Sequence, residues 1–466
     1  MRIKFGTDGW RGVIARDFTF ANVERVAAAI AAYLNEKGQA ARGVIVGFDN
    51  RFLADRFAEA VAEVLLQWGI PVYFPERSVP TPVVAFGIWH YRTGGAVVIT
   101  ASHNPPEYCG IKFIPEYAGP ALPDVTERIE SLIESSPSPP AGVKKALRHP
   151  FRPQEDYFAH LLRLVEGEKI ARASLKVVVD PMFGAGIGYL EEILRRCGVS
   201  VVTIHDWRDP LFGGDLPDPV PSRLGELAAK VKETGAHLGL ALDGDADRLG
   251  VITGEGHFVT PNQVLSLLCY HLLSYRGWRG PVARTVATTH LVDRIASAFG
   301  VETKETPVGF KYLGKLLREE GCLCAGEESG GLSVKGHVPE KDGILAGLLV
   351  VEMAAVHGGS LWRLWEEVKE KFGEVVSRRR DYRTSAEDKE RILRLLAGWA
   401  ESREELAGQK VVERITMDGV KFVLADGSWV LVRASGTEPV FRVYVEASTE
   451  EKVSHLHETL KAELGF

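Results

Sequence analysis

The chain has 466 residues, 45% of them hydrophobic and 25% charged, and a formal net charge of −6. This length predicts about three or four domains, and the composition is typical of a globular protein. The mild negative charge argues against nucleic acid or an anionic membrane as partners, because either would need a basic face. It does not exclude small anionic substrates, whose binding depends on local positive groups.

The cysteines favour a reducing compartment. There are five, and their odd number and irregular spacing match neither a disulfide framework nor a zinc knuckle. We therefore expect reduced, mostly buried thiols and a cytoplasmic location. The N-terminal segment lacks the apolar run of a signal peptide. Residues 343–356 are strongly apolar but too short to cross a bilayer, which needs ~20 apolar residues, so we expect a buried helix there.

Helix and strand signals alternate over the first 370 residues, in an order that recurs. The first copy predicts a helix around 23–34, a strand at 43–48, a helix at 52–68 and a strand at 71–74. The second copy predicts a strand at 175–180, a helix at 189–197 and a strand at 199–204. A weaker third copy covers 281–304. This repetition indicates several α/β units whose mainly parallel sheets are covered by helices.

Two segments predict domain boundaries. Residues 135–142 are rich in Pro and Ser and are typical of a linker. Residues 373–385 end the α/β pattern. The tail then predicts a helix at 386–400, short strands at 421–424, 429–433 and 442–446, and a last helix from about 450. The tail is therefore expected to be a separate α+β domain.

The strongest local signal is the acidic segment DGDADR at residues 243–248, which lies between two expected strands. Three carboxylates at alternate positions can converge on one hard cation such as Mg²⁺ or Ca²⁺. A calcium-binding EF-hand loop is excluded, because its sixth and twelfth positions require Gly and Glu. These positions hold Arg248 and Gly254. A solvated acidic turn is the alternative interpretation.

A second signal is the polar loop that begins after the β-branched segment 97–100 and carries Ser102 and His103. Ser102 would lie at the C-terminal edge of a strand, where open α/β sheets bind ligands. A serine hydrolase is disfavoured, because the loop has no Gly-x-Ser-x-Gly elbow. In addition, neighbouring residues of an extended segment point to opposite faces, which would place His103 poorly as a base. An ordinary loop is the alternative.

Three further loops contain glycine and polar groups. RASGTEP at 433–439 offers an arginine fork, two hydroxyls and accessible backbone N–H groups, which suit a phosphate. GEESGG at 326–331 follows an expected strand at 322–325 and offers acceptors and hydroxyls that suit a sugar. FGTDGWRG at 5–12 carries one arginine. Each signal is weak by itself, and a surface turn is the alternative for each.

Together, these five segments resemble the α-D-phosphohexomutase family, whose motifs occur in the same order. The resemblance spans nearly the whole chain. It implies an α/β fold with three similar α/β/α domains, built on mixed sheets, and a C-terminal α+β domain around a central cleft. We place the domains at residues 1–142, 143–254, 255–373 and 374–466. They would carry the phosphoserine, metal, sugar-recognition and phosphate-binding loops, respectively.

The resemblance also implies roles for the matched residues. Ser102 would be phosphorylated, and it would bind Mg²⁺ together with Asp243, Asp245 and Asp247. Lys112 would be a general acid/base. The other residues lining the transfer site would be Arg11, His103 and Arg248. The substrate-binding residues would be Lys311, Glu327, Ser329, Arg433, Ser435, Gly436 and Thr437.

The implied activity interconverts glucose 1-phosphate and glucose 6-phosphate through a phosphoserine enzyme, with glucose 1,6-bisphosphate as intermediate and activator. The protein would be a magnesium-dependent isomerase of carbohydrate metabolism and a phosphoprotein. It would bind sugar phosphates and act as a monomer or homodimer. A phosphoserine carries about −1.5 to −2 charge, so Mg²⁺ and nearby cations would be needed beside three aspartates. A fourth domain hinged near 373–385 would let the bisphosphate turn around.

Glucose is favoured by two departures from the mannose and glucosamine relatives. The sugar loop contains EESGG rather than ending in Gly-His, and the segment PEKDG at 339–343 is more similar to phosphoglucomutases. Cys109 replaces an Asn of several relatives without removing a catalytic group. The alternatives are a phosphomannomutase or dual-specificity enzyme and, ranked lower, a phosphoglucosamine mutase. A non-catalytic sugar-phosphate binder is a distant alternative, because the expected catalytic and metal-binding residues are all present.

Overall fold

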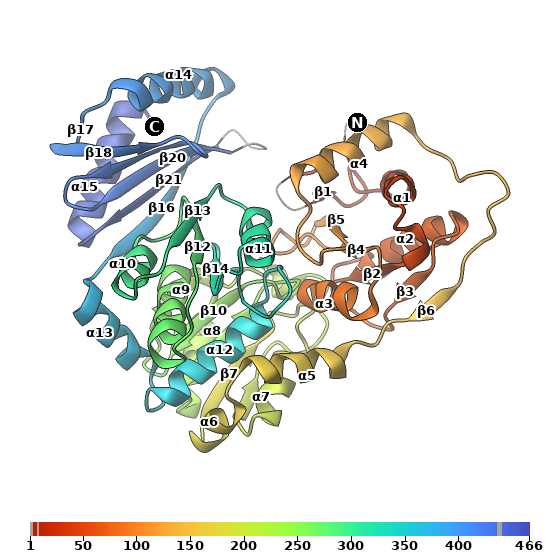
Figure 1. Cartoon of the computed structure of the whole chain (residues 1–466), viewed down its shortest axis with the longest axis horizontal. Coiled ribbons are helices and arrows are strands. Elements are labelled where there is room, and N and C mark those ends of the chain that lie inside the picture. The colour runs from red at the N-terminus through yellow and green to blue at the C-terminus, as the bar shows by residue number, and fades with distance from the viewer. Residues whose placement is uncertain (1–2, 7–8, 436–439) are drawn as a thin grey trace.

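The computed structural model describes residues 3–6, 9–435 and 440–466, and the strands in these residues form four sheets. Figure 1 shows the first sheet, near the N-terminus, and the fourth sheet, near the C-terminus, on opposite sides of the molecule, with the second and third between them. The fold is therefore three α/β/α units followed by a C-terminal α+β unit, as the sequence predicts.

The first unit includes the expected linker and one strand that follows it. Its strands are β1 (Trp10–Val13), β2 (Val44–Phe48), β3 (Val72–Phe74), β4 (Gly95–Ile99), β5 (Tyr108–Pro115) and β6 (Arg148–Pro150). Its helices are α1 (Phe20–Glu36), α2 (Ala54–Gln67), α3 (Thr81–Tyr91) and α4 (Pro123–Ser135). β6 pairs in parallel with β3. The first sheet thus includes a strand that lies beyond residue 142, the end of the domain proposed from the sequence.

The second unit contains the acidic segment. Its strands are β7 (Lys176–Asp180), β8 (Ser200–Thr203), β9 (Leu238–Leu242), β10 (Leu249–Thr253) and β11 (Phe258–Val259). Its helices are α5 (Gln154–Leu164), α6 (Gly167–Arg172), α7 (Leu190–Arg196) and α8 (Gly225–Thr234).

The third unit contains the expected sugar loop. Its strands are β12 (Val282–Thr285), β13 (Thr303–Thr306), β14 (Cys324–Gly326) and β15 (Leu332–Val334). Its helices are α9 (Pro261–Tyr270), α10 (Leu291–Ala298), α11 (Phe310–Glu319), α12 (Gly343–Val356) and α13 (Leu361–Phe372). The helix starts have local causes: Thr260 forms a capping box with Gln263 at α9, and the Asp342 side chain accepts from two backbone N–H groups at α12.

The three α/β/α units repeat one strand order. The central strands run β5-β4-β2-β3 in the first sheet, β10-β9-β7-β8 in the second and β15-β14-β12-β13 in the third. In each unit, the second strand of this order pairs in parallel with the third strand and antiparallel with the first strand, which directly follows it in the chain. The loops that join the second strand to the first are the phosphoserine, metal and sugar loops predicted from the sequence. The repeat therefore places the three loops at equivalent positions.

The fourth unit is built differently. Its sheet is antiparallel, with the order β16-β21-β20-β19-β18-β17. The strands are β16 (Val376–Arg383), β17 (Glu405–Leu406), β18 (Gln409–Ile415), β19 (Val420–Leu424), β20 (Trp429–Ala434) and β21 (Val440–Ala447), and the helices are α14 (Ala386–Ser402) and α15 (Glu450–Leu464). Most of residues 373–385, the hinge expected from the sequence, form the edge strand β16.

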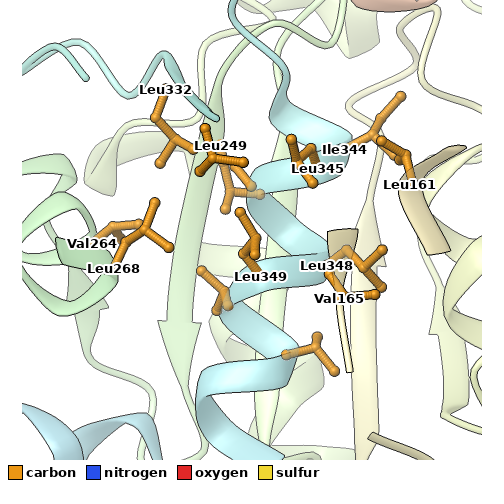
Figure 2. Packing of buried hydrophobic residues seen from close by; sticks show 14 of the residues in the cluster. Leu161, Val165, Leu249, Val264, Leu268, Leu332, Ile344, Leu345, Leu348 and Leu349 are labelled. Atoms are coloured by element: carbon orange, nitrogen blue, oxygen red, sulfur yellow. The ribbon is translucent and has the colours of Figure 1, made fainter. Parts of the chain in front are cut away.

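One apolar core joins the first three units. It runs from Ile45 in β2 through Val177 in β7 to Leu349 in α12. Figure 2 shows α12 at its centre, with Leu345 and Leu348 packed among residues of other elements. Residues 343–354 of α12 are all buried, which confirms the predicted buried helix. The fourth unit has a core of its own, which includes Phe422 and Phe441.

Among the described residues, no single helix is long and apolar enough to cross a membrane. Only α12 and α13 taken together pass that test of length and composition, as a pair bent by 80°. All five cysteines are free, as expected from their number and spacing, and all five are buried.

Candidate active site

Ser102 lies in the loop that connects β4 to β5, and its side chain is buried, with 1% of the residue exposed. Its Oγ donates a hydrogen bond to Asp243 Oδ2 at 2.7 Å. The backbone of Ser102 is left-handed, with φ of 50°, a conformation that costs energy in a residue other than glycine. The first and second units therefore meet at this serine.

The placement of His103 differs from the sequence expectation. Because Ser102 is left-handed rather than extended, the neighbouring side chains do not point to opposite faces, and His103 Nδ1 lies 3.4 Å from Ser102 Oγ. The geometric reason given against a Ser–His pair is thus wrong. Burial, followed by nearby Arg248 and Arg11, holds the pKa of His103 well below its ordinary 6.5. Ser102 Oγ is nevertheless closer to the carboxylate of Asp243, at 2.7 Å, than to the imidazole of His103, at 3.4 Å.

The acidic loop after β9 brings Asp243, Asp245 and Asp247 together, with one oxygen of each within 4.8 Å of the others. The loop is closed by Asp243 Oδ1, which accepts hydrogen bonds from the backbone N–H groups of Asp247 and Arg248 at 2.9 and 3.0 Å. Gly244 is required here, because a Cβ at this residue would lie 2.5 Å from the carbonyl oxygen of Ser102.

This donor set fits a hard divalent cation. Burial raises the pKa of Asp243 well above its ordinary 3.8, and the charges of Asp247 and Asp245 raise it further. Asp247 Oδ1 is buried and accepts no hydrogen bond from any residue that the structure describes. Carboxylate oxygens suit Mg²⁺, so a cation among these oxygens would offset the crowded charge and contact the oxygen that accepts no hydrogen bond. Ser102 Oγ lies where it could complete such a site.

Two buried lysines balance part of this charge. Lys112, on β5, places its Nζ 2.9 Å from Asp245 Oδ2 and 3.2 Å from Asp247 Oδ2. Lys341 Nζ lies 3.3 Å from the same oxygen of Asp247. In the sequence, the segment around Lys341 serves only as a sign of sugar preference, and the position of Lys341 at the site is not predicted. The only signal was an uncommon lysine between two acids just before a buried helix.

Two arginines lie beside the loops. Arg248 places its Nε 3.9 Å from Asp247 Oδ1 and its Nη1 3.9 Å from Asp218 Oδ1. Arg11, on β1, donates through Nη1 to Asn104 Oδ1 in the serine loop. The predicted transfer site is therefore assembled from β1, the β4–β5 loop, β5 and the β9–β10 loop. The structure brings its predicted residues into one neighbourhood.

The sugar loop follows β14 and adjoins the metal loop. Glu327 and Gly331 close it by a backbone hydrogen bond of 2.9 Å, and Leu249 N–H donates to Gly330 O at 3.4 Å. Ser329 Oγ donates to Glu327 Oε2 at 3.4 Å. Burial raises the pKa of Glu327 to about 7. The loop thus presents a carboxyl and a hydroxyl beside the phosphoryl-transfer residues.

The loop predicted to bind the non-reacting phosphate lies on the fourth unit. Arg433, at the end of β20, pairs with Asp418 at 2.8 Å, and the same Asp418 oxygen accepts from Val308 N–H of the third unit at 3.1 Å. Lys311 is the second residue of α11, three residues beyond Val308. Ser435 N–H donates to Val440 O at 2.8 Å. Gly436 and Thr437 lie outside the described residues.

Comparison with known proteins agrees with this architecture. Models of the phosphoglucomutase/phosphomannomutase α/β/α domains I, II and III match residues 2–139, 155–256 and 260–372, and the model of the C-terminal domain matches 384–463. The chain is a phosphohexomutase, a mutase-type phosphotransferase, and belongs to the phosphoglucomutase/phosphomannomutase family.

Individual relatives carry different names. A "Probable phosphoglucosamine mutase" of Methanothermobacter thermautotrophicus is 33% identical, with 99% of this chain and 97% of that protein covered. A "Phosphoglucomutase/phosphomannomutase" of Thermococcus kodakarensis is also 33% identical, with 96% and 95% covered. The crystal structure of a "putative phosphomannomutase" from Thermus thermophilus is 35% identical, covers both chains fully and gives a TM-score of 0.87. The names agree on the chemistry and differ on the sugar.

Proposed function

We propose that this chain interconverts hexose 1-phosphates and hexose 6-phosphates by carrying the phosphoryl group on Ser102. The supporting observation is the contact of 2.7 Å between Ser102 Oγ and Asp243 at the edge of the acidic triad. In a hydrolase, the serine would donate to a base that activates it. Here the hydroxyl points at a cluster of carboxylates that suits a cation, which is the environment a phosphoserine needs.

Asp243, Asp245 and Asp247 would hold Mg²⁺, which would neutralise charge on the phosphoryl oxygens when bound. In the forward half-reaction, the free hydroxyl of the substrate attacks the phosphorus of phosphoserine, and the bond from phosphorus to Ser102 Oγ breaks. Lys112 is the group proposed to accept the proton of the attacking hydroxyl through its neutral amine and to return a proton to Ser102 Oγ as that oxygen leaves the phosphorus. The return half-reaction transfers the other phosphate of the bisphosphate to Ser102.

The remaining residues would hold and stabilise the substrate. Arg11, Arg248 and the neutral ring of His103 line the serine loop, where they can hydrogen-bond to phosphoryl oxygens. Glu327 and Ser329 would bind sugar hydroxyls. The residues proposed to bind the non-reacting phosphate are Lys311, Arg433, Ser435, Gly436 and Thr437. A bisphosphate such as glucose 1,6-bisphosphate would be the intermediate and activator.

We propose glucose as the preferred sugar, on the basis of the EESGG loop and the PEKDG segment. Phosphoglucosamine is the second candidate, because several similar proteins carry the name "Probable phosphoglucosamine mutase". Mannose is the third, because of the Thermococcus and Thermus relatives. The five free cysteines support the expected cytoplasmic location.

The test compares wild-type protein, Ser102→Ala and the surface control Ser200→Ala. Each is supplied with glucose 1-phosphate, mannose 1-phosphate or glucosamine 1-phosphate, Mg²⁺ and a catalytic amount of the matching bisphosphate. We expect the fastest conversion with glucose, no measurable conversion by Ser102→Ala with any sugar, and wild-type rates for Ser200→Ala. Equal rates with glucose and glucosamine would overturn the sugar preference. Full activity of Ser102→Ala would overturn the mechanism.

A further inference from the structure

The buried segment Asp49–Asn50–Arg51 follows β2 and contacts the serine loop and a loop of the second unit. Between 0 and 3% of each of these three residues is exposed. None of them is among the residues assigned above to the metal, the proton or the substrate. Fully buried charged side chains are rare unless they are paired and hydrogen-bonded, and each of these three side chains has defined hydrogen-bond partners.

Arg51 holds the serine loop by its backbone. Its Nη2 donates to the carbonyl oxygens of Ser102 and Asn104, each at 2.6 Å. Its Nη1 donates to the carbonyl oxygens of Pro105 and Tyr108 at 2.7 and 3.0 Å. A planar guanidinium can satisfy several acceptors in one fixed geometry, which an ammonium cannot. One side chain thus fixes the loop from the serine itself to the start of β5.

Asp49 holds the same loop through Thr100. Its Oδ1 accepts from the backbone N–H of Arg51 at 2.9 Å, and its Oδ2 accepts from Thr100 Oγ1 at 2.6 Å. Thr100 Oγ1 in turn accepts from the backbone N–H of Ser102 at 2.8 Å. Both the N–H and the C=O of Ser102 are therefore held by a chain of contacts that starts at β2, and Ser102 is the residue with the left-handed backbone.

Asn50 extends this network to the second unit. Its Nδ2 donates to the carbonyl oxygens of Phe183 and Gly184, each at 2.8 Å. The next residue, Ala185, donates its backbone N–H to Gly244 O in the acidic loop at 2.9 Å. Three successive side chains thus connect the serine loop with the segment that supports the metal loop.

We propose that Asp49, Asn50 and Arg51 are positioning residues that set the location of Ser102 Oγ relative to Asp243, Asp245 and Asp247. The inference rests on the proposed role of Ser102 as phosphoryl carrier. Arg51 holds the strained loop, and Asn50 holds the facing segment. Phosphoryl transfer requires the nucleophile in line with the phosphorus, and a displacement of about 1 Å costs roughly a hundredfold in rate. The network should therefore control transfer to Ser102 and leave sugar-phosphate binding unchanged.

The experiment uses the full-length protein in Mg²⁺ and measures the single-turnover rate of Ser102 phosphorylation by labelled glucose 1,6-bisphosphate. The dissociation constant for glucose 1-phosphate and the melting temperature are measured alongside. Arg51→Lys keeps the positive charge but loses the fork. The matched control is Arg276→Lys, because Arg276 is also poorly accessible, pairs with Glu352 and donates to a backbone carbonyl at 2.8 Å, that of Leu164.

We expect Arg51→Lys to slow phosphorylation by roughly 10- to 100-fold, while the dissociation constant changes less than about twofold. Arg276→Lys should leave both unchanged, even if it lowers the melting temperature. A phosphorylation rate of Arg51→Lys within about twofold of wild type would overturn the inference. So would a parallel loss of rate and affinity, because that would indicate general damage rather than positioning.

A second pair of variants keeps the test decisive if Arg51→Lys does not fold. Thr100→Val removes the hydroxyl between Asp49 and Ser102 N–H at nearly equal volume, and Thr100→Ser keeps it. We expect Thr100→Val to slow Ser102 phosphorylation by roughly tenfold and Thr100→Ser to restore the wild-type rate. Equal rates for Val and Ser would overturn the inference. If wild-type Ser102 takes up no label, it is the proposed function that fails.

Discussion

Ser102 and Arg433 have contrasting surroundings, although both are expected to handle phosphate. The side chain of Ser102 is buried and contacts a carboxylate of the next unit. The Arg433 side chain is 15% exposed and pairs with Asp418 of its own unit. The first three units share one apolar core, whereas the fourth has a separate core. The loops predicted to carry the reaction are therefore fixed relative to one another by a shared core, and the loop predicted to bind the second phosphate belongs to a unit with a core of its own.

The fourth unit has its own apolar core and contacts the third unit through apolar and polar side chains. A short apolar cluster joins Val286 and Ala287 of the third unit to Trp429, Leu431 and Tyr444 of the fourth. Beside this cluster, Lys421 donates to Val286 O at 2.8 Å and lies 3.0 Å from Glu305. We therefore expect the fourth unit to move relative to the other three during turnover. Unchanged small-angle scattering with and without sugar phosphate would contradict this.

The largest expected effect is loss of the cation at the acidic triad. Three buried carboxylates beside a phosphoserine repel one another unless a cation offsets their charge. We expect EDTA, and separately Asp245→Asn, to lower kcat by at least roughly a thousandfold. Adding Mg²⁺ in excess should restore the wild-type enzyme and not the variant. Undiminished turnover in EDTA would show that the triad acts without a metal.

Removal of the Lys112 ammonium should have the next largest effect. Lys112→Met deletes the proposed proton-exchange group and leaves Asp245 and Asp247 less compensated. We expect kcat to fall by about 10²- to 10⁴-fold, the usual range for general acid–base catalysis, with KM nearly unchanged. Steady-state kinetics at saturating bisphosphate measure this. A change confined to KM would instead make Lys112 a binding residue.

A variant of the loop predicted to bind the second phosphate should behave in the opposite way. Arg433→Met removes a charge-assisted contact to the phosphate that does not react, so binding of the ground state and of the transition state should weaken together. We expect KM to rise by about 10- to 100-fold and kcat to change by less than about threefold. Conversely, a large loss of kcat at an unchanged KM would break the division between a reactive region and a holding region.

The smallest expected effect is a pH dependence of docking of the fourth unit. Burial, followed by nearby Arg284, lowers the pKa of Lys421 to about 8 from its ordinary 10.5. The undocked lysine therefore binds more protons than the docked one between these two values. Docking should strengthen as pH rises from about 8 toward 10.5.

The radius of gyration from small-angle scattering, measured across this window, checks the direction. Lys421→Met has no titrating group at this position and should remove the change. An identical pH response in wild type and Lys421→Met would show that another group is responsible.

Local sequence patterns predicted the loops but not all of their partners. The acidic segment and the serine loop are recognisable because each follows an apolar strand. Lys341 lies 94 residues along the chain from Asp247, which it contacts, and Arg51 lies 51 residues from Ser102, which it contacts. No local pattern encodes such pairs, since packing of the units creates them. The expectation for His103 failed for a related reason, because a left-handed residue in a polar loop leaves no mark in hydrophobic periodicity.

The fold was predicted best where apolar segments are long. The helices around α1 and α14 and the strands β2, β7 and β20 are found close to their expected positions. β16 was missed because four of its eight residues are arginines on an exposed edge, and such a segment lacks the apolar alternation of a half-buried strand. The predicted domain end at residue 142 also left β6, which pairs with β3 in the first sheet, outside the first domain.

The most direct test of the account is to locate the phosphoryl group on the protein. Wild-type enzyme is mixed with Mg²⁺ and glucose 1,6-bisphosphate, quenched, digested and mapped by mass spectrometry, with and without a chase of glucose 1-phosphate. We predict one phosphopeptide, modified at Ser102, whose phosphate is lost to the sugar in the chase. Continued turnover with Ser102 unmodified, or with the phosphate on another residue, would contradict the account.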